Sequence, residues 1–281
     1  MAAPRLTTYT HQGLTFDVED AGPEGGEPVV LLHGWPQSSS SWEPVAERLH
    51  ASGFRTFAPD QRGYSPGASP KGRGQYRLPL VAGDAAALID AIGGGPVHVI
   101  GHDWGAAAAY ALAAAAPDRV RTLTTLAVPH PGAFLRSLVT SDQLLRSWYM
   151  GFFQLPALPE YLIRNHPDRF VRALESTGQT HQRAVRDIDF LIRAGIITTL
   201  NWYRAIPLSD PRATRQPITV PTLHVYGTAD GALARQGAAL NGRFVTGPYR
   251  LEVLEGVSHW IPEEVPDTVV RLFLEHAGPV A

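Results

Sequence analysis

The chain has 281 residues, of which 44% are hydrophobic and 18% are charged, and its formal net charge is −2. This composition is ordinary for a globular protein and gives no electrostatic reason to expect binding to nucleic acid or to an anionic membrane. The absence of cysteine excludes disulfides, thiolate catalysis and cysteine-ligated zinc. The length accommodates one large α/β domain with an insertion.

Residues 6–11 and 14–20 are predicted strands on either side of a turn, and nearly continuous apolar runs predict strands at 28–32, 54–58, 96–100, 120–128, 222–226 and 250–254. Helical spacing of apolar residues predicts helices at 42–52, 80–92, 106–116 and 267–276. The first two strands flank Gln12-Gly13 and are expected to form a hairpin. Because the later strands alternate with helices, we predict a mostly parallel eight-stranded sheet with helices on both faces.

Residues 131–216 depart from this alternation. They contain no run typical of a buried strand, whereas residues 141–149, 167–177 and 182–193 have helical patterns. A segment of this length is too long for a structureless loop. We therefore predict a helical lid, or cap, at 131–216, inserted into a core made of residues 1–130 and 217–281.

The run Gly101-His102-Asp103-Trp104-Gly105 lies between a predicted strand and an alanine-rich predicted helix. A strand, a G-x-nucleophile-x-G turn and a helix form the nucleophile elbow of the α/β-hydrolase fold. The turn is sharp and requires small flanking residues, which glycine supplies on both sides. Many such hydrolases carry serine at the tip. Asp103 in its place predicts attack on an sp3 carbon and an alkyl-enzyme ester.

Two further ionisable residues follow predicted strands in the order expected for this fold. Asp230 comes after the strand at 222–226, and His259 comes after the strand at 250–254. Each residue alone is also consistent with an ordinary turn, and their joint order at strand ends is what favours a catalytic triad. In that triad Asp103 attacks carbon, His259 activates water and Asp230 orients the imidazole.

Hydrolysis of an ester on Asp103 creates an oxyanion, which backbone N–H groups would stabilise. Trp104, directly after the nucleophile, supplies one such group. Trp35, in His33-Gly34-Trp35-Pro36 at the end of a neighbouring strand, is placed to supply the other. The same residues are equally consistent with a tight exit from that strand.

The chain resembles the α/β-hydrolase superfamily and, within it, the epoxide hydrolase family. The resemblance covers nearly the whole chain and depends on five motifs, which are His33-Gly34-Trp35-Pro36, Asp60-Gln61-Arg62-Gly63-Tyr64-Ser65, Gly101 to Gly105, the Gly-Thr-x-Asp turn at Asp230 and Gly256-x-Ser-His259. Haloalkane dehalogenases share the aspartate nucleophile and these core motifs. One departure is Gly231, at a position where proline is frequent in relatives.

The resemblance implies that Tyr149 and Tyr203 are the two lid tyrosines that protonate the epoxide oxygen. Tyr149 lies in Ser147-Trp148-Tyr149-Met150-Gly151-Phe152-Phe153, and Tyr203 lies in Asn201-Trp202-Tyr203-Arg204. An alkoxide leaving group needs a proton, and a phenol with a pKa near ~10 can donate one while staying protonated beforehand. We expect an apolar substrate pocket lined by Trp35, Trp104, Trp148, Phe152 and Phe153.

The expected activity is cofactor-independent, metal-free hydrolysis of a small apolar epoxide by water, without nucleic acid or membrane partners. The first residues lack the apolar core of a signal peptide and no run is long enough to span a membrane, so we expect a cytoplasmic protein. The sequence is compatible with a monomer or a homodimer. The alternatives are a haloalkane dehalogenase and a non-catalytic small-molecule binder on a hydrolase scaffold. A serine-type esterase is disfavoured because no serine occupies the elbow.

Overall fold

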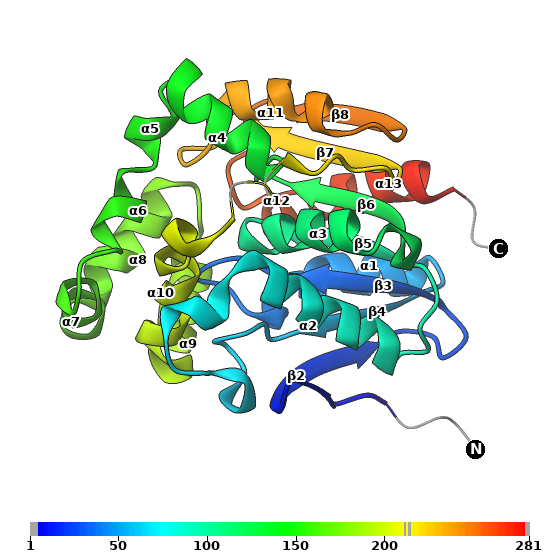
Figure 1. The fold of residues 1–281 in the computed structure, drawn as a ribbon, viewed down its shortest axis with the longest axis horizontal. Helices are drawn as coiled ribbons and strands as arrows, with labels where there is room; N and C mark the ends of the chain where they lie inside the picture. The colour runs from blue at the N-terminus through cyan, green and yellow to red at the C-terminus, as the bar shows by residue number, and fades with distance from the viewer. Residues whose placement is uncertain (1–4, 211, 213–214, 279–281) are drawn as a thin grey trace.

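The computed structural model describes residues 5–210, 212 and 215–278, and within these residues eight strands form one sheet (Figure 1). The strands are β1 (Thr8–His11), β2 (Leu14–Ala21), β3 (Glu27–Leu32), β4 (Phe54–Pro59), β5 (Val97–His102), β6 (Val120–Leu126), β7 (Thr222–Gly227) and β8 (Tyr249–Leu254). Their order is β1-β2-β4-β3-β5-β6-β7-β8. β1 and β2 form the predicted hairpin, β2 is antiparallel to β4, and the remaining pairs are parallel. The predicted sheet is confirmed.

Helices cover both faces of this sheet. α2 (Leu78–Ala91) and α3 (Trp104–Ala115) pack together on one face, and α1 (Glu43–Ala51) and α13 (Pro266–Ala277) pack together on the other (Figure 1). The remaining core helices are α11 (Arg235–Asn241) and α12 (Ile261–Glu264). Short 3-10 helices occupy connections at η1 (Ser39–Trp42), η2 (Pro66–Ala68), η3 (Arg73–Tyr76), η4 (Pro117–Arg119), η5 (Ile206–Leu208) and η7 (Gly242–Phe244).

The apolar runs of the central strands are explained by burial on both faces. In β3, Val30 and Leu32 pack into the cluster under α2 and α3, whereas Val29 and Leu31 pack into the cluster with α1 and α13. Successive side chains of a strand point to opposite faces, so a strand covered on both sides buries side chains in both directions and is rich in apolar residues. The central strands are therefore held rigidly, and their carboxyl ends give a firm base for a site.

The helices between residues 143 and 204, called the cap below, lie beyond the carboxyl ends of the parallel strands, at the left of Figure 1. Its helices are α5 (Gln143–Arg146), α6 (Trp148–Phe152), α7 (Leu158–Asn165), α8 (Pro167–Ser176), α9 (His181–Ala194) and α10 (Ile196–Arg204). The helices α6 to α10 share a separate apolar cluster that includes Ile163, Leu174, Ile188 and Leu200. α4 (Pro131–Thr140) precedes them and packs against α11 of the core. The exact division of the chain at 131 and 216 stays a prediction.

Two of the predicted cap helices are confirmed as α8 and α9. The prediction of one helix at 141–149 is wrong, because the chain leaves helical geometry at Ser147 between α5 and α6. α4, α7 and α10 were not predicted from the sequence. α7 is short and begins Leu-Pro, and α10 is rich in β-branched residues that have modest helix propensity, so tertiary packing decides both.

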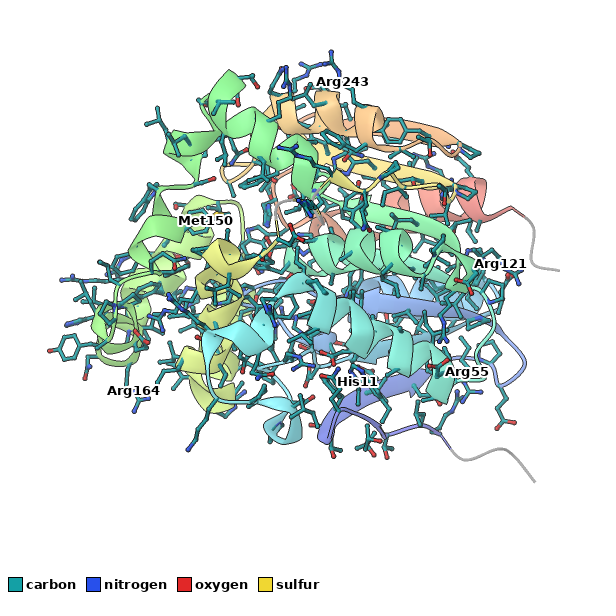
Figure 2. The ribbon with its side chains drawn as sticks, in the orientation of Figure 1. His11, Arg55, Arg121, Met150, Arg164 and Arg243 are labelled. Carbon is teal, nitrogen blue, oxygen red and sulfur yellow. The ribbon has the colours of Figure 1, made fainter. Side chains whose placement is uncertain are left out.

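Several arginine side chains lie on the outer surface of the molecule. Figure 2 shows Arg55 and Arg121 at the end of the sheet away from the cap, and Arg164 at the outer end of the cap. Among the helices of the described residues, none has both the length and the hydrophobicity of a membrane span.

Candidate active site

Asp103 stands at the tip of a sharp turn between β5 and α3. Its backbone angles are φ 51° and ψ −121°, a conformation that residues other than glycine rarely adopt and that costs free energy. A Cβ atom at Gly105 would collide with the carbonyl oxygen of Leu32. The turn therefore has the backbone geometry expected of a nucleophile elbow, and glycine is required where neighbouring chain segments pass so closely.

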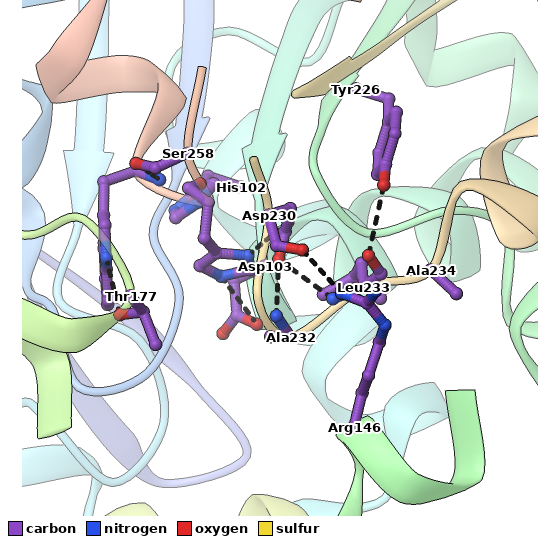
Figure 3. Close-up of polar contacts among 12 residues, drawn as sticks. His102, Asp103, Arg146, Thr177, Tyr226, Asp230, Ala232, Leu233, Ala234 and Ser258 are labelled. Carbon is purple, nitrogen blue, oxygen red and sulfur yellow. Dashed lines mark hydrogen bonds and ion pairs between the residues drawn. The ribbon is translucent and has the colours of Figure 1, made fainter. Parts of the chain in front are cut away.

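Loops after β7 and β8 bring Asp230 and His259 to Asp103. The Nδ1 atom of His259 lies 2.8 Å from Oδ2 of Asp230, and its Nε2 atom lies 3.6 Å from Oδ2 of Asp103. The other oxygen of Asp230 accepts hydrogen bonds from the N–H groups of Ala232, at 2.7 Å, and Leu233, at 2.9 Å (Figure 3). All three side chains of the predicted triad are buried. The imidazole thus lies between two carboxylates, and one of these is held in place by backbone donors.

The charges of this site depend on one another. Burial alone would lower the pKa of His259, but the negative charges of Asp230 and Asp103 raise it to about 10. Burial alone would raise the pKa of Asp103, but its contacts with His259 lower it below the usual range. At neutral pH the site is therefore an ion pair of an Asp103 carboxylate, able to act as a nucleophile, and an imidazolium.

Backbone N–H groups point at the Asp103 carboxylate. The N–H of Trp35 donates to Oδ1 of Asp103 at 2.8 Å. The backbone N–H of Trp104 also helps to lower the pKa of this carboxylate. A Cβ atom at Gly34 would overlap the Asp103 side chain, so the chain can approach this closely only with glycine there. Both N–H groups predicted from the sequence are therefore next to the oxygens of residue 103.

The cap brings Tyr149 of α6 and Tyr203 of α10 together, with their ring centroids 5.9 Å apart. Tyr203 also packs edge-on against Trp35 and Trp104, at centroid distances of 5.7 and 5.1 Å. Burial raises the pKa of both phenols well above the usual value, and the negative charge of Asp103 adds to this effect. Both phenols are therefore protonated at neutral pH and can donate a proton.

The predicted aromatic residues border two cavities beside Asp103. Trp35, Phe152 and Phe153 line one of about 440 Å³, and Trp104 lines a second of about 340 Å³. Trp148 also borders the larger cavity, but it is 71% exposed and so lies at its outer rim. Other lining residues, such as Phe134, Leu135, Met150, Phe170 and Ile206, belong to no motif, because only tertiary packing brings them to the cavities.

The structure also reveals a buried polar cluster that the sequence did not indicate. Glu263 of α12 accepts a hydrogen bond from the Gln37 side chain at 2.7 Å and pairs with Arg186 of cap helix α9 at 2.9 Å. His102 lies 3.1 Å from the oxygen of the Gln37 amide and 2.9 Å from the carbonyl oxygen of His259. This cluster connects the cap to the loop that carries His259.

Comparison with known proteins agrees with this architecture. The family described as alpha/beta hydrolase fold matches residues 27–266. The chain is 34% identical to AB hydrolase superfamily protein YfhM of Bacillus subtilis, over 94% of each chain. It is 30% identical to Epoxide hydrolase 4 of Homo sapiens, over 97% of this chain and 79% of the human one. The crystal structure of Epoxide Hydrolase A from Mycobacterium thermoresistibile aligns with a TM-score of 0.82 and 27% identity, over 96% of both chains.

Proposed function

Because the chain belongs to the epoxide hydrolase family of the α/β-hydrolase superfamily, we propose that it hydrolyses epoxides to vicinal diols through an ester on Asp103. The observation that carries the proposal is the arrangement of charges. A buried carboxylate lies 3.6 Å from an imidazole that a second carboxylate orients. Two protonated phenols lie together in the cap, and both border the larger cavity, which Asp103 also borders.

The first step is ring opening. A carboxylate oxygen of Asp103 attacks one ring carbon, and the bond from that carbon to the epoxide oxygen breaks. Tyr149 or Tyr203 donates a proton to the departing oxygen, which leaves a phenolate. Esterification removes the charge of Asp103, so the pKa of His259 falls and its extra proton can move through the site to that phenolate. The result is a neutral ester, a neutral imidazole and two protonated phenols.

The second step is hydrolysis of the ester. Neutral His259 takes a proton from water, and the hydroxide attacks the carboxyl carbon of Asp103. The N–H groups of Trp35 and Trp104 stabilise the oxyanion that forms on the carboxyl group, an effect of ~10²–10³ in rate for each donor in comparable enzymes. The His259 imidazolium gives its proton to the expelled diol oxygen, and the carboxylic-acid proton left on Asp103 then passes to His259. Asp230 holds the imidazole throughout, and the starting ion pair is restored.

The phenols favour an epoxide over a haloalkane as the substrate. A halide leaves as a stable anion and needs only N–H donors, whereas an alkoxide needs a proton. The Trp104 side chain, which would be one halide donor, packs edge-on against the Tyr203 ring at a centroid distance of 5.1 Å. Release of halide from a bromoalkane without diol formation from any epoxide would instead indicate a dehalogenase.

A single turnover in ¹⁸O-labelled water, with enzyme in excess over styrene oxide, tests the covalent route. The first diol should contain no label, because its new oxygen comes from Asp103. The label should enter the carboxylate and appear in diol from later turnovers, measured by mass spectrometry. A labelled diol in the first turnover would overturn the proposal.

The His259→Gln variant tests the order of the two steps. It keeps the nucleophile and removes the base, so the enzyme should gain the mass of one epoxide and retain it. The matched control is the double variant that also carries Asp103→Asn, which should gain no mass. An unmodified His259→Gln protein after incubation with substrate would contradict the assigned roles.

A further inference from the structure

Glu263 of α12 is a buried carboxylate that the proposed reaction does not use. It is 3% exposed, and each of its oxygens has two partners. Oε2 accepts hydrogen bonds from the side-chain amides of Gln37, at 2.7 Å, and Gln179, at 3.1 Å. Oε1 lies 2.9 Å from Nη2 of Arg186 and 3.4 Å from Nε of Arg183. Because a buried carboxylate is stable only when donors surround it, removal of its charge should loosen all four contacts.

The four partners come from separate parts of the chain. Gln37 lies in the loop after β3, two residues beyond Trp35, whose N–H is one of the two oxyanion donors. Glu263 itself follows His259 by four residues. The other three partners lie on cap helix α9 or at most two residues before it. One carboxylate therefore joins the cap to the two core segments that carry an oxyanion donor and the base.

The Gln37 side chain continues this connection toward the triad. It is fully buried, and its amide oxygen lies 3.1 Å from Nδ1 of His102. The Nε2 atom of His102 lies 2.9 Å from the carbonyl oxygen of His259, and His102 directly precedes Asp103. Because Glu263 accepts a hydrogen bond from the NH2 group of Gln37, it fixes which end of the amide faces His102. A change at Glu263 therefore reaches the triad through side chains in direct contact.

From these contacts, and resting on the function proposed above, we infer that Glu263 is a positioning residue for hydrolysis of the ester. It acts through Gln37 on the loop of Trp35, and through its own segment on His259. Trp35 and His259 have their proposed roles in the second step, whereas ring opening depends on Asp103 and the two cap phenols. A misplacement of about 1 Å can slow a reaction by ~10²-fold, so loss of the Glu263 charge should slow the second step selectively.

Glu263→Gln tests this inference, because it removes the charge and keeps the shape of the side chain. The rate constants of ester formation and ester hydrolysis are measured before the steady state with styrene oxide, by stopped-flow tryptophan fluorescence. Hydrolysis should slow by ~10–100-fold, and formation should stay within threefold of the wild-type value. The ester should then accumulate in the steady state, where intact mass spectrometry after an acid quench detects it.

Asp187→Asn is the matched control. Asp187 is a second buried carboxylate of the same cluster, and it lies 2.6 Å from Nη2 of Arg186 and 3.2 Å from the amide nitrogen of Gln179. Within the part of the chain that the structure describes, its hydrogen bonds and ion pairs are with the cap alone. This variant should leave the ratio of the two rate constants within twofold of the wild-type ratio. If Asp187→Asn lowers the ratio as much as Glu263→Gln does, general loosening of the cap is the cause, and the inference is wrong.

Gln37→Leu tests the core side of the connection and decides the outcome if Glu263→Gln does not fold. It removes the amide that lies between Glu263 and His102, and it leaves the cap partners of Glu263 in place. The same selective slowing of ester hydrolysis is expected. Folded variants that hydrolyse the ester at the wild-type rate would overturn the inference. If the wild-type enzyme forms no ester with styrene oxide, the proposed function itself fails.

Discussion

His259 must change its protonation state during the proposed cycle, and the Asp103→Asn variant isolates the cause. In the resting enzyme the two carboxylates hold the pKa of His259 at about 10, so the imidazole is cationic at neutral pH and cannot accept a proton. Formation of the ester removes the charge of Asp103. Asparagine has the shape of aspartate without its charge and therefore imitates the esterified residue.

The size of the effect follows from the geometry. Oδ2 of Asp103 lies 3.6 Å from Nε2 of His259. Two unit charges at that separation interact by ~4–5 kcal/mol at an effective dielectric constant of ~20. This energy corresponds to a fall in pKa of about three, so His259 of the variant should titrate near pH ~7. A base with that pKa is well suited to activate water at neutral pH.

The assay is a nuclear magnetic resonance titration of ¹⁵N-histidine-labelled protein between pH 5 and 11, with the His259 signal assigned by its loss in His259→Gln. High-resolution intact mass confirms that residue 103 is still asparagine. In the wild-type enzyme, the rate of ester hydrolysis measured before the steady state should rise with pH and level off above ~7.

A His259 signal that titrates above pH 9 in the Asp103→Asn variant would refute this reasoning. It would mean that Asp230 alone keeps the imidazole charged after ester formation. Loss of the Asp103 charge could then not convert His259 into a base.

Three further outcomes are expected. Tyr149→Phe and Tyr203→Phe together should slow ester formation by ~10²–10⁴-fold, and each substitution alone should slow it less. The rate is followed by stopped-flow tryptophan fluorescence. A double variant that forms the ester at the wild-type rate would exclude the phenols as acids. Gly105→Ala should lower the free energy of unfolding by ~1–3 kcal/mol in urea titrations, because the new Cβ meets the carbonyl oxygen of Leu32; wild-type stability would contradict the tight turn. Burial raises the pKa of the Asp187 carboxyl to about 7. The protonated form therefore stabilises the folded protein fully below the unfolded pKa of ~4, and this stabilisation is lost as pH rises through about 7. Asp187→Asn should therefore be less sensitive to pH than the wild type when urea midpoints at pH 5 and 8 are compared, and parallel behaviour would show that another group is responsible.

The sequence alone determined the alternation of strands and helices and the turn that carries Asp103. These features depend on local rules. A strand buried on both faces favours a nearly continuous apolar run, as at Val29 to Leu32 of β3, and a sharp turn requires small residues beside its tip. The order Asp103, Asp230, His259 could also be predicted, because parallel strands place their carboxyl ends at one edge of the sheet.

Only the tertiary structure decided the cap and what it encloses. α10 has weak intrinsic helix propensity and α5 and α6 are separated by a break, so their positions depend on packing against other helices. Glu263 is an ordinary surface residue in sequence pattern, yet it is buried and paired with Arg186 from a helix far away along the chain. The two cavities are spaces left between side chains from many elements, and no local pattern encodes such a space. The chemistry at Asp103 could therefore be predicted from short motifs, whereas the shape of the space that binds the substrate depends on contacts between distant residues.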